Sequence, residues 1–216
     1  MSRIVVVGGS GRTGKLIVEQ LIANGDTVVA TIRNPKHMAS LVKLGAETVM
    51  LDLEASTGPE FATVFRGADA VVFAAGSGEG ESSAIDRTGT LKTVRAAAKA
   101  GVGRYVTIAS LGSSTPVPKE FKTPEMKEYF AAKKAGNKAI RASSLKWTII
   151  EPGELGEGKG TGKIALSEDG IDNKMIPRAD VAATVVAVLA APKTVGKTFQ
   201  IVGGSTPIAK AVAAAI

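Results

Sequence analysis

The sequence has no cysteine and only one histidine, His37, among its 216 residues. The absence of cysteine excludes disulfides, thiolate metal sites and thiol nucleophiles, and it is typical of proteins from a reducing compartment. A single histidine excludes a histidine-rich metal site, and a Ser-His-Asp mechanism would have to use His37. We therefore expect no metal centre.

Long apolar runs are also missing, so no segment is expected to span a bilayer, and strand-like sequence begins too early to leave room for a targeting peptide. The net charge of +7 indicates an anionic partner. The densest basic stretch, 119–146, is interleaved with glutamates, which is typical of a solvated helix face rather than a nucleic-acid groove. We expect a cytoplasmic protein with a small phosphorylated ligand, and no nucleic-acid or membrane partner.

Short runs rich in β-branched residues alternate with helical stretches along the first 150 residues. The runs are continuously apolar, as in strands that helices cover on both faces. This alternation predicts an α/β fold with a doubly wound parallel sheet in one domain, 1–216. The expected strands are 4–7, 27–31, 48–51, 70–73, 105–108 and 147–150, and the expected helices are 15–23, 35–44, 58–65, 82–100 and 124–143.

The pattern loosens in the glycine-rich segment 151–177. We expect this segment to form a small irregular flap over one end of the sheet, where a substrate would lie. Beyond it, the sequence predicts a helix at 179–189, a strand at 199–202 and a short terminal helix.

A glycine cluster stands where the first strand would lead into the first helix. Gly8, Gly11 and Gly14 form G-x-x-G-x-x-G, in which the first glycine permits the turn, the second admits a pyrophosphate and the third lets helix pack on strand. The free N–H groups at the start of the helix then face the anion. This position favours dinucleotide binding over a purely structural turn.

The second strand ends in "TIRNP", without the acid that would accept hydrogen bonds from the ribose 2′-OH of NAD. Arg33 occupies this place, and Arg12 in the glycine turn is within reach of the same phosphate. The alternative interpretation is that both arginines are ordinary surface charges. The missing acid favours NADP over NAD as the cofactor.

Four segments together carry a family resemblance: "VVGGSGRTG", "RYVTIAS", "YFAAKKAGNKAIRASSLKWTIIEPGEL" and "GKTFQIVGGSTPIAKAV". The chain resembles the atypical short-chain dehydrogenases/reductases, in particular small Rossmann-type proteins related to NmrA-like regulators and to flavin and biliverdin reductases. The resemblance implies distinct contacts along the cofactor. The pyrophosphate is assigned to Gly8, Ser10, Gly11, Arg12, Thr13 and Gly14, the adenosine phosphate to Arg33, the adenine to Asp52 and Leu53, the cofactor ribose to Ala74, Ala75 and Gly76, and the nicotinamide to Pro152 and Gly153.

Tyr129 and Lys133 form Y-x-x-x-K, which on a helix places both side chains on one face. In the short-chain dehydrogenases the ammonium favours the phenolate, so that the tyrosine exchanges a proton with a carbonyl or alcohol, and the lysine anchors the nicotinamide ribose. The alternative is an amphipathic helix that simply buries Phe130. The family's catalytic serine corresponds to Ser110, Ser113 or Ser114; we select Ser110, although each of the three is also a common loop residue.

Three functions follow from this reading. The first is an NADPH-dependent oxidoreductase that transfers hydride to a small carbonyl, quinone or flavin-like acceptor. The second is an NADP(H)-sensing regulator that binds the cofactor without catalysis, because small members of the family often lack a working triad. A sugar-nucleotide epimerase or dehydratase ranks third, because such a pocket normally needs more chain after the sixth strand. The sequence leaves a monomer and a homodimer equally open.

Overall fold

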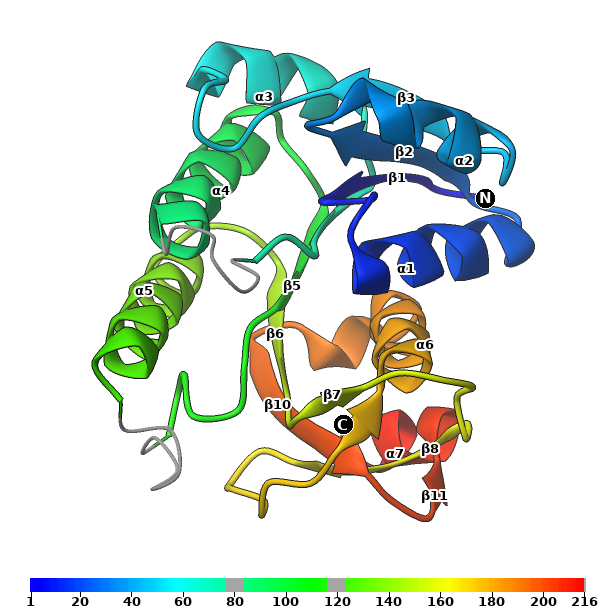
Figure 1. The fold of residues 1–216 in the computed structure, drawn as a ribbon, viewed down its shortest axis with the longest axis vertical. Helices are drawn as coiled ribbons and strands as arrows, with labels where there is room; N and C mark the ends of the chain where they lie inside the picture. The colour runs from blue at the N-terminus through cyan, green and yellow to red at the C-terminus, as the bar shows by residue number, and fades with distance from the viewer. Residues whose placement is uncertain (77–83, 116–122, 216) are drawn as a thin grey trace.

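A computed structural model describes residues 1–76, 84–115 and 123–215 of the chain and shows one large sheet with helices on both faces (Figure 1). The strand order within these residues is β11-β8-β10-β6-β5-β4-β1-β2-β3. All neighbours from β3 to β10 pair in parallel, whereas β8 runs antiparallel to β10 and β11. The strands of the sheet are β1 (Arg3–Val7), β2 (Thr27–Ile32), β3 (Glu47–Met50), β4 (Ala70–Phe73), β5 (Arg104–Ile108), β6 (Trp147–Pro152), β8 (Lys163–Ser167), β10 (Lys197–Gly203) and β11 (Thr206–Pro207).

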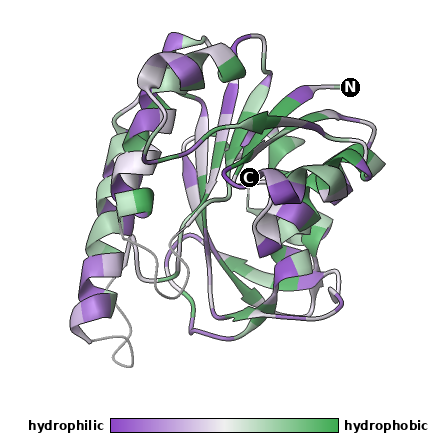
Figure 2. Ribbon diagram, turned by 45° about the horizontal axis from the view of Figure 1, so that its top comes forward, coloured by the Kyte–Doolittle hydropathy of each residue, from purple (hydrophilic) through white to green (hydrophobic). Residues whose placement is uncertain are grey.

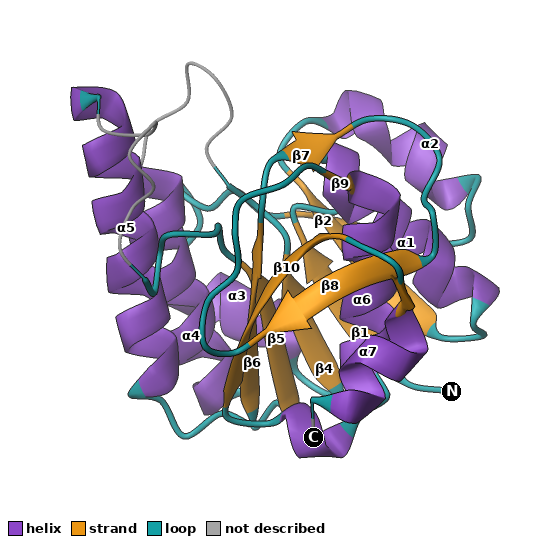
Figure 3. Ribbon diagram, turned by 90° about the horizontal axis from the view of Figure 1, so that it is seen from below, coloured by secondary structure: helices purple, strands orange, loops and turns teal. Residues whose placement is uncertain are grey.

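The helices form two layers. Figure 3 shows α3, α4 and α5 on one side of the sheet and α1, α6 and α7 on the other. In Figure 2 the helices carry both hydrophilic and hydrophobic segments, as expected for helices that pack on a sheet with one side and face water with the other. The helices are α1 (Arg12–Ala23), α2 (Met38–Val42), α3 (Gly58–Phe65), α4 (Thr90–Lys99), α5 (Pro124–Arg141), α6 (Arg178–Leu189) and α7 (Ile208–Ala214).

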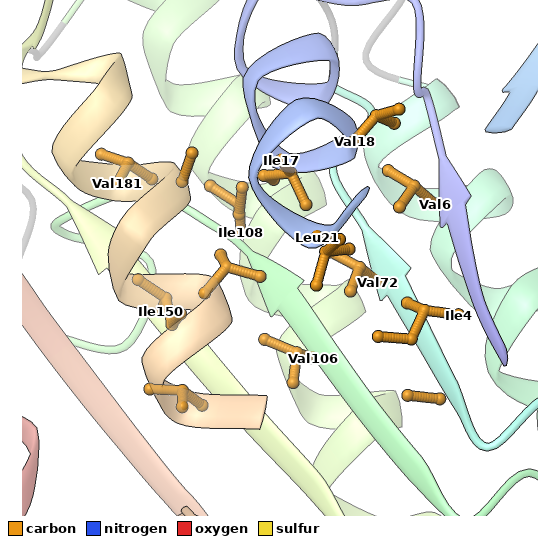
Figure 4. Close-up of a cluster of buried hydrophobic side chains, with 14 of the residues drawn as sticks. Ile4, Val6, Ile17, Val18, Leu21, Val72, Val106, Ile108, Ile150 and Val181 are labelled. Carbon is orange, nitrogen blue, oxygen red and sulfur yellow. The ribbon is translucent and has the colours of Figure 1, made fainter. Parts of the chain in front are cut away.

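The alternation of side chains along each strand divides the interior into two apolar cores. Along β1, Ile4 and Val6 join the core beneath α1 and α6, whereas Val5 and Val7 join the core beneath α3 and α4. Figure 4 shows the first of these cores, where residues of α1 and α6 point toward β1, β4, β5 and β6. Burial on both faces explains why the strands read as continuously apolar.

The helix predicted over 35–44 is divided into a 3₁₀ turn, Pro35–His37, and the short α2. The helix predicted over 82–100 begins among residues outside the described ones, and its described part opens with a π-helical turn, Ile85–Gly89, before α4. Both differences arise at helix starts, where the sequence periodicity is too short to separate one kind of turn from another.

The expectation of an irregular flap over 151–177 is wrong in part. β8 belongs to the main sheet, and β7 (Leu155–Gly156) pairs in parallel with β9 (Ile176–Pro177). β9 and α6 lie between β8 and β10 along the chain, so these five residues join the sheet through pairing with strands that follow much later in the sequence. No helix among the described residues is long and apolar enough to cross a membrane.

Candidate cofactor and active site

A cavity of about 720 Å³ opens at the carboxyl ends of the parallel strands. The chain winds outward from β1 through β2 to β3 in one direction and from β4 through β5 to β6 in the other. Ligands of open α/β sheets bind where the winding direction reverses. The cavity lies at this reversal, because the segments that directly follow β1 and β4 both contribute to its lining.

The glycine turn between β1 and α1 has no space for a side chain at its first and last glycines. A Cβ on Gly8, whose φ is +80°, would come within 2.8 Å of the Ala75 backbone, and a Cβ on Gly14 would stand 2.1 Å from the Gly8 carbonyl oxygen. Thr31 on β2 holds the turn from beneath, because its Oγ1 accepts a hydrogen bond from Gly8 N at 3.3 Å and its carbonyl oxygen accepts one from Gly9 N at 3.2 Å. The turn is therefore fixed before any ligand arrives.

The start of α1 suits an anion. Its N-cap, Gly11, provides no side-chain hydrogen bond, and its first turn contains no acidic residue. The backbone N–H groups of this turn and the positive end of the helix dipole thus face the cavity without a carboxylate from their own helix.

Basic side chains surround this end of the cavity, which Arg12, Arg33 and Arg178 all line. Arg12 Nη1 lies 2.8 Å and Arg178 Nε 2.9 Å from the same oxygen, Glu157 Oε1. Hydrogen bonds from Arg178, with the nearby charge of Arg12, lower the pKa of Glu157. The cation of Arg178 was not foreseen, because no local pattern connects the start of α6 with the glycine turn.

Asp52, which follows β3, also lines the cavity. Its Oδ1 accepts hydrogen bonds from Glu54 N at 2.7 Å and Ala55 N at 3.0 Å. The hydrogen bond from Ala55, then that from Glu54 and the charge of Arg33, lower the pKa of Asp52 despite its partial burial. This carboxylate thus shapes the 52–55 turn at the cavity wall.

At the inner end of the cavity, Tyr129 and Lys133 lie on one face of α5, as the Y-x-x-x-K spacing predicts. Lys133 Nζ is 5.5 Å from the centroid of the Tyr129 ring and 2.7 Å from Asp86 Oδ1. Burial alone would lower the pKa of Lys133, but its electrostatic interactions with Tyr129 and Asp86 and its hydrogen bond to Asp86 outweigh burial and raise it. The sequence analysis missed Asp86, because an acidic residue at a helix start is usually a solvated one.

None of the three candidate serines is among the residues that line this cavity. Ser113 Oγ donates to Glu151 Oε1 at 3.2 Å, and Ser114 Oγ donates to the same oxygen. Asn137 Nδ2 also donates to that oxygen, at 3.0 Å. Burial raises the pKa of Glu151 against these hydrogen bonds. The selection of Ser110 therefore stays a prediction, and the other two serines serve a buried network around Glu151.

The structure brings most of the sequence-predicted site residues to one cavity. Those that line it are Gly8, Ser10, Gly11, Arg12, Thr13, Arg33, Asp52, Leu53, Ala74, Ala75, Gly76, Tyr129 and Lys133. Gly14, Pro152 and Gly153 do not line it: Gly14 is buried against the glycine turn, Pro152 is buried in β6, and a Cβ on Gly153 would stand 2.4 Å from the Lys174 carbonyl oxygen. The segment before β9 thus covers the point expected to meet the nicotinamide.

Known proteins resemble the chain along nearly its whole length. The family model described as NAD(P)H-binding matches residues 8–192. A Bacillus subtilis protein whose name is uncharacterized sugar epimerase YhfK is 34% identical over 215 residues, which cover 97% of this chain and 98% of that protein. A solved Bacillus halodurans structure, named after the NAD-dependent epimerases/dehydratases, is 34% identical, covers 99% of this chain and 100% of its own, and has a TM-score of 0.90.

A second solved structure, of the oxidoreductase ylbE from Lactococcus lactis, is 26% identical and has a TM-score of 0.85, with 98% of this chain and 95% of its own covered. The fold, the match to the family model and these similarities agree with the glycine turn and the cavity at the sheet reversal. The chain therefore belongs to the NAD(P)H-binding family, and its resemblance to the atypical short-chain dehydrogenases/reductases is confirmed.

Proposed function

We propose that the protein is an NADPH-dependent oxidoreductase that transfers hydride to a small carbonyl, quinone or flavin-like acceptor. One observation carries this proposal: a single cavity contains the glycine turn, Arg33, and the Tyr129–Lys133 pair. Its volume of about 720 Å³ lies within the range of ordinary ligand sites. The family supports oxidoreductase chemistry in general, and the acceptor and the choice of NADPH are parts of the proposal.

The residues present fit a dinucleotide. The glycine turn and the start of α1 would hold the pyrophosphate, since the first turn of α1 lines the cavity and contains no acidic residue. Arg33, with Arg12, would hold the 2′-phosphate through charge-assisted hydrogen bonds. Lys133 would donate to the nicotinamide ribose. When bound, the nicotinamide would supply the hydride.

Tyr129 would deliver the proton that accompanies the reduction of a carbonyl. Tyr129 lies on the same helix face as Lys133 and lines the cavity, so an acceptor bound there would be near its side chain. The acceptor would be small or loosely held, because the described residues form a single domain with no separate substrate domain to enclose a large one.

The sensing alternative is supported by the serines. Because Ser113 and Ser114 donate to Glu151 and Ser110 does not line the cavity, the site is better equipped for cofactor binding than for a complete catalytic triad. A protein of this kind would bind NADP(H) and pass the signal to a protein partner. An epimerase or dehydratase acting on a sugar nucleotide stays the third candidate, and its main support is the names of the two similar Bacillus proteins.

The test is whether the purified protein oxidises NADPH in the presence of a panel of carbonyls, quinones and flavins. The reaction is measured as the loss of NADPH absorbance. We expect Tyr129→Phe to lower turnover of a carbonyl by about 100-fold, the scale of a lost general acid, with NADPH affinity changed less than about threefold. The matched control is Tyr105→Phe, which removes the same atom from the other tyrosine, outside the cavity. NADPH binding without turnover of any acceptor would favour sensing.

A further inference from the structure

The ion pair between Lys133 and Asp86 is buried more completely than a surface salt bridge. The exposed fraction is 8% for the Lys133 side chain and 0% for that of Asp86, and the atoms Nζ and Oδ1 are 2.7 Å apart. A buried ammonium without a counter-charge tends to lose its proton, and a buried carboxylate tends to gain one. The Asp86 carboxylate therefore helps to keep the Lys133 ammonium protonated despite its burial.

The backbone around Asp86 is arranged to bring the carboxylate to α5. Asp86 lies in the π-helical turn Ile85–Gly89, and π-turns inside helices are frequent at functional sites. The Asp86 carbonyl oxygen accepts a hydrogen bond from Thr90 Oγ1 at 2.7 Å. A Cβ on Gly136 would stand 3.1 Å from that same oxygen, so α5 approaches the turn as closely as a glycine permits.

The pair also borders the cavity. A Cβ on Gly76, in the segment after β4, would stand 3.2 Å from Lys133 Nζ and 3.3 Å from Asp86 Oδ1. Gly76 and Lys133 both line the cavity. The ammonium is thus held against the segment that a cofactor ribose would pass, before any ligand is bound.

We propose that Asp86 is the positioning residue of Lys133, fixing its ammonium at the Gly76 edge of the cavity so that it donates to a ribose hydroxyl. This inference rests on the proposed function, because the ribose belongs to the NADPH placed there. Asp86 acts through Lys133 and makes no contact with the cofactor itself. The same carboxylate offsets part of the field of the ammonium at Tyr129, so the lysine serves more as an anchor than as an activator of the phenol.

The charged surroundings of Lys133 are simple among the described residues. Asp86 faces it from the π-helical turn, and Tyr129 faces it from its own helix, one turn away. The neighbouring polar residues from α4, β5 and α5 are Thr90, Thr107 and Asn137, which do not titrate. Without the Asp86 carboxylate, Lys133 would lose one of its two opposing electrostatic interactions and its hydrogen bond, and burial would lower the pKa of Lys133 relative to the wild-type protein.

The test measures NADPH dissociation constants between pH 6 and pH 9 for the wild-type protein and Asp86→Asn, by calorimetry. The ratio of the two constants cancels the titration of the nucleotide itself. We expect this ratio to rise about tenfold or more with pH, since the asparagine variant would lose the ammonium proton over this range. Asp86→Glu, which retains a carboxylate, and Asp86→Asn/Lys133→Met, which retains no ammonium, should each show a flat ratio.

A flat ratio for Asp86→Asn, with wild-type binding intact, would overturn the role of Asp86 and leave the proposed function standing. Absence of NADPH binding by the wild-type protein would reject both. If Asp86→Asn does not fold, the role of Asp86 is tested by urea unfolding without cofactor. The free energy of unfolding of Lys133→Met is then compared with that of Asp86→Asn/Lys133→Met. The double variant should be at least as stable as Lys133→Met, because it removes a buried carboxylate that has lost the ammonium beside it. A less stable double variant would overturn the proposal, since Asp86 would then have a structural role apart from Lys133.

Discussion

Replacement of Arg33 by aspartate tests the choice of cofactor most directly. Arg33 follows β2 directly and lines the cavity, close to Thr31, which holds the glycine turn. The change exchanges a guanidinium, which suits a phosphate, for a carboxylate, which suits a ribose 2′-OH. Arg33→Asp should therefore weaken the binding of NADPH and strengthen that of NADH.

The surroundings of Arg33 set the size of the effect. Its side chain is exposed, so its charge is screened by water and salt. The new aspartate would also face Asp52, whose lowered pKa keeps it ionised at neutral pH. A lost charge-assisted hydrogen bond together with this repulsion corresponds to a loss of NADPH affinity of about 10- to 100-fold.

Calorimetric titration of NADPH and NADH into the wild-type protein, Arg33→Asp and the control Arg66→Asp would measure this loss. Arg66 is an exposed arginine at the end of α3 that does not line the cavity, so its replacement changes the net charge equally. The ratio of the NADPH and NADH dissociation constants should change in Arg33→Asp alone. Equal NADPH affinity in the wild-type protein and Arg33→Asp would refute the assignment of the 2′-phosphate to this end of the cavity.

Two further predictions concern glutamates. Glu157→Gln removes the carboxylate that Arg12 and Arg178 share, so NADPH should bind about two- to fivefold more tightly by calorimetry. The gain is modest because the side chains of Glu157 and Arg12 are largely exposed. Unchanged affinity, as in the control Glu154→Gln, would contradict this prediction. The pKa of Glu151 is raised above its ordinary value of 4.5, chiefly by burial, so the folded protein holds this proton more tightly than the unfolded chain. The stability of the wild-type protein relative to Glu151→Gln should therefore be highest below pH 4.5 and fall as pH rises through the folded-state pKa, as urea unfolding at several pH values would measure; a pH-independent difference would contradict it.

The parallel core of the fold could be predicted because its signals are local. Runs such as 4–7 and 70–73 are apolar on both faces, and the observed β1 and β4 bury both faces in separate cores. β8 gave a weaker signal. Its burial is uneven, with Ile164 buried and Lys163 exposed, because a strand near the sheet edge need cover only one face. Five such residues among glycines do not stand out from a loop.

The candidate site also contains residues that local sequence signals predict and residues that they do not. The glycine turn and Arg33 follow strands directly, so their place at the sheet edge was fixed by sequence order. Arg178 reaches the cavity region through the packing of α6 on α1, and Asp86 reaches it through the packing of α5 against the π-helical turn. Glu157, the shared partner of Arg178 and Arg12, lies 21 residues from the first and 145 residues from the second along the chain. Such contacts depend on tertiary structure, and no spacing rule in the sequence connects their members.

The two ends of the cavity hold their cations in opposite ways. Arg12 and Arg33 are exposed at the end proposed for the adenosine, where an exchange of one charge would alter binding without leaving an unpaired group in the interior. Lys133 is buried at the other end, where loss of its partner would leave an uncompensated charge inside the protein. Substitutions at the exposed end can therefore change the preferred cofactor at little cost to stability. A substitution of only one member of the buried pair should lower the stability of the folded protein more than a substitution at Arg12 or Arg33. Cofactor preference therefore depends on the exposed end of the cavity, and the integrity of the proposed reaction site depends on the buried end.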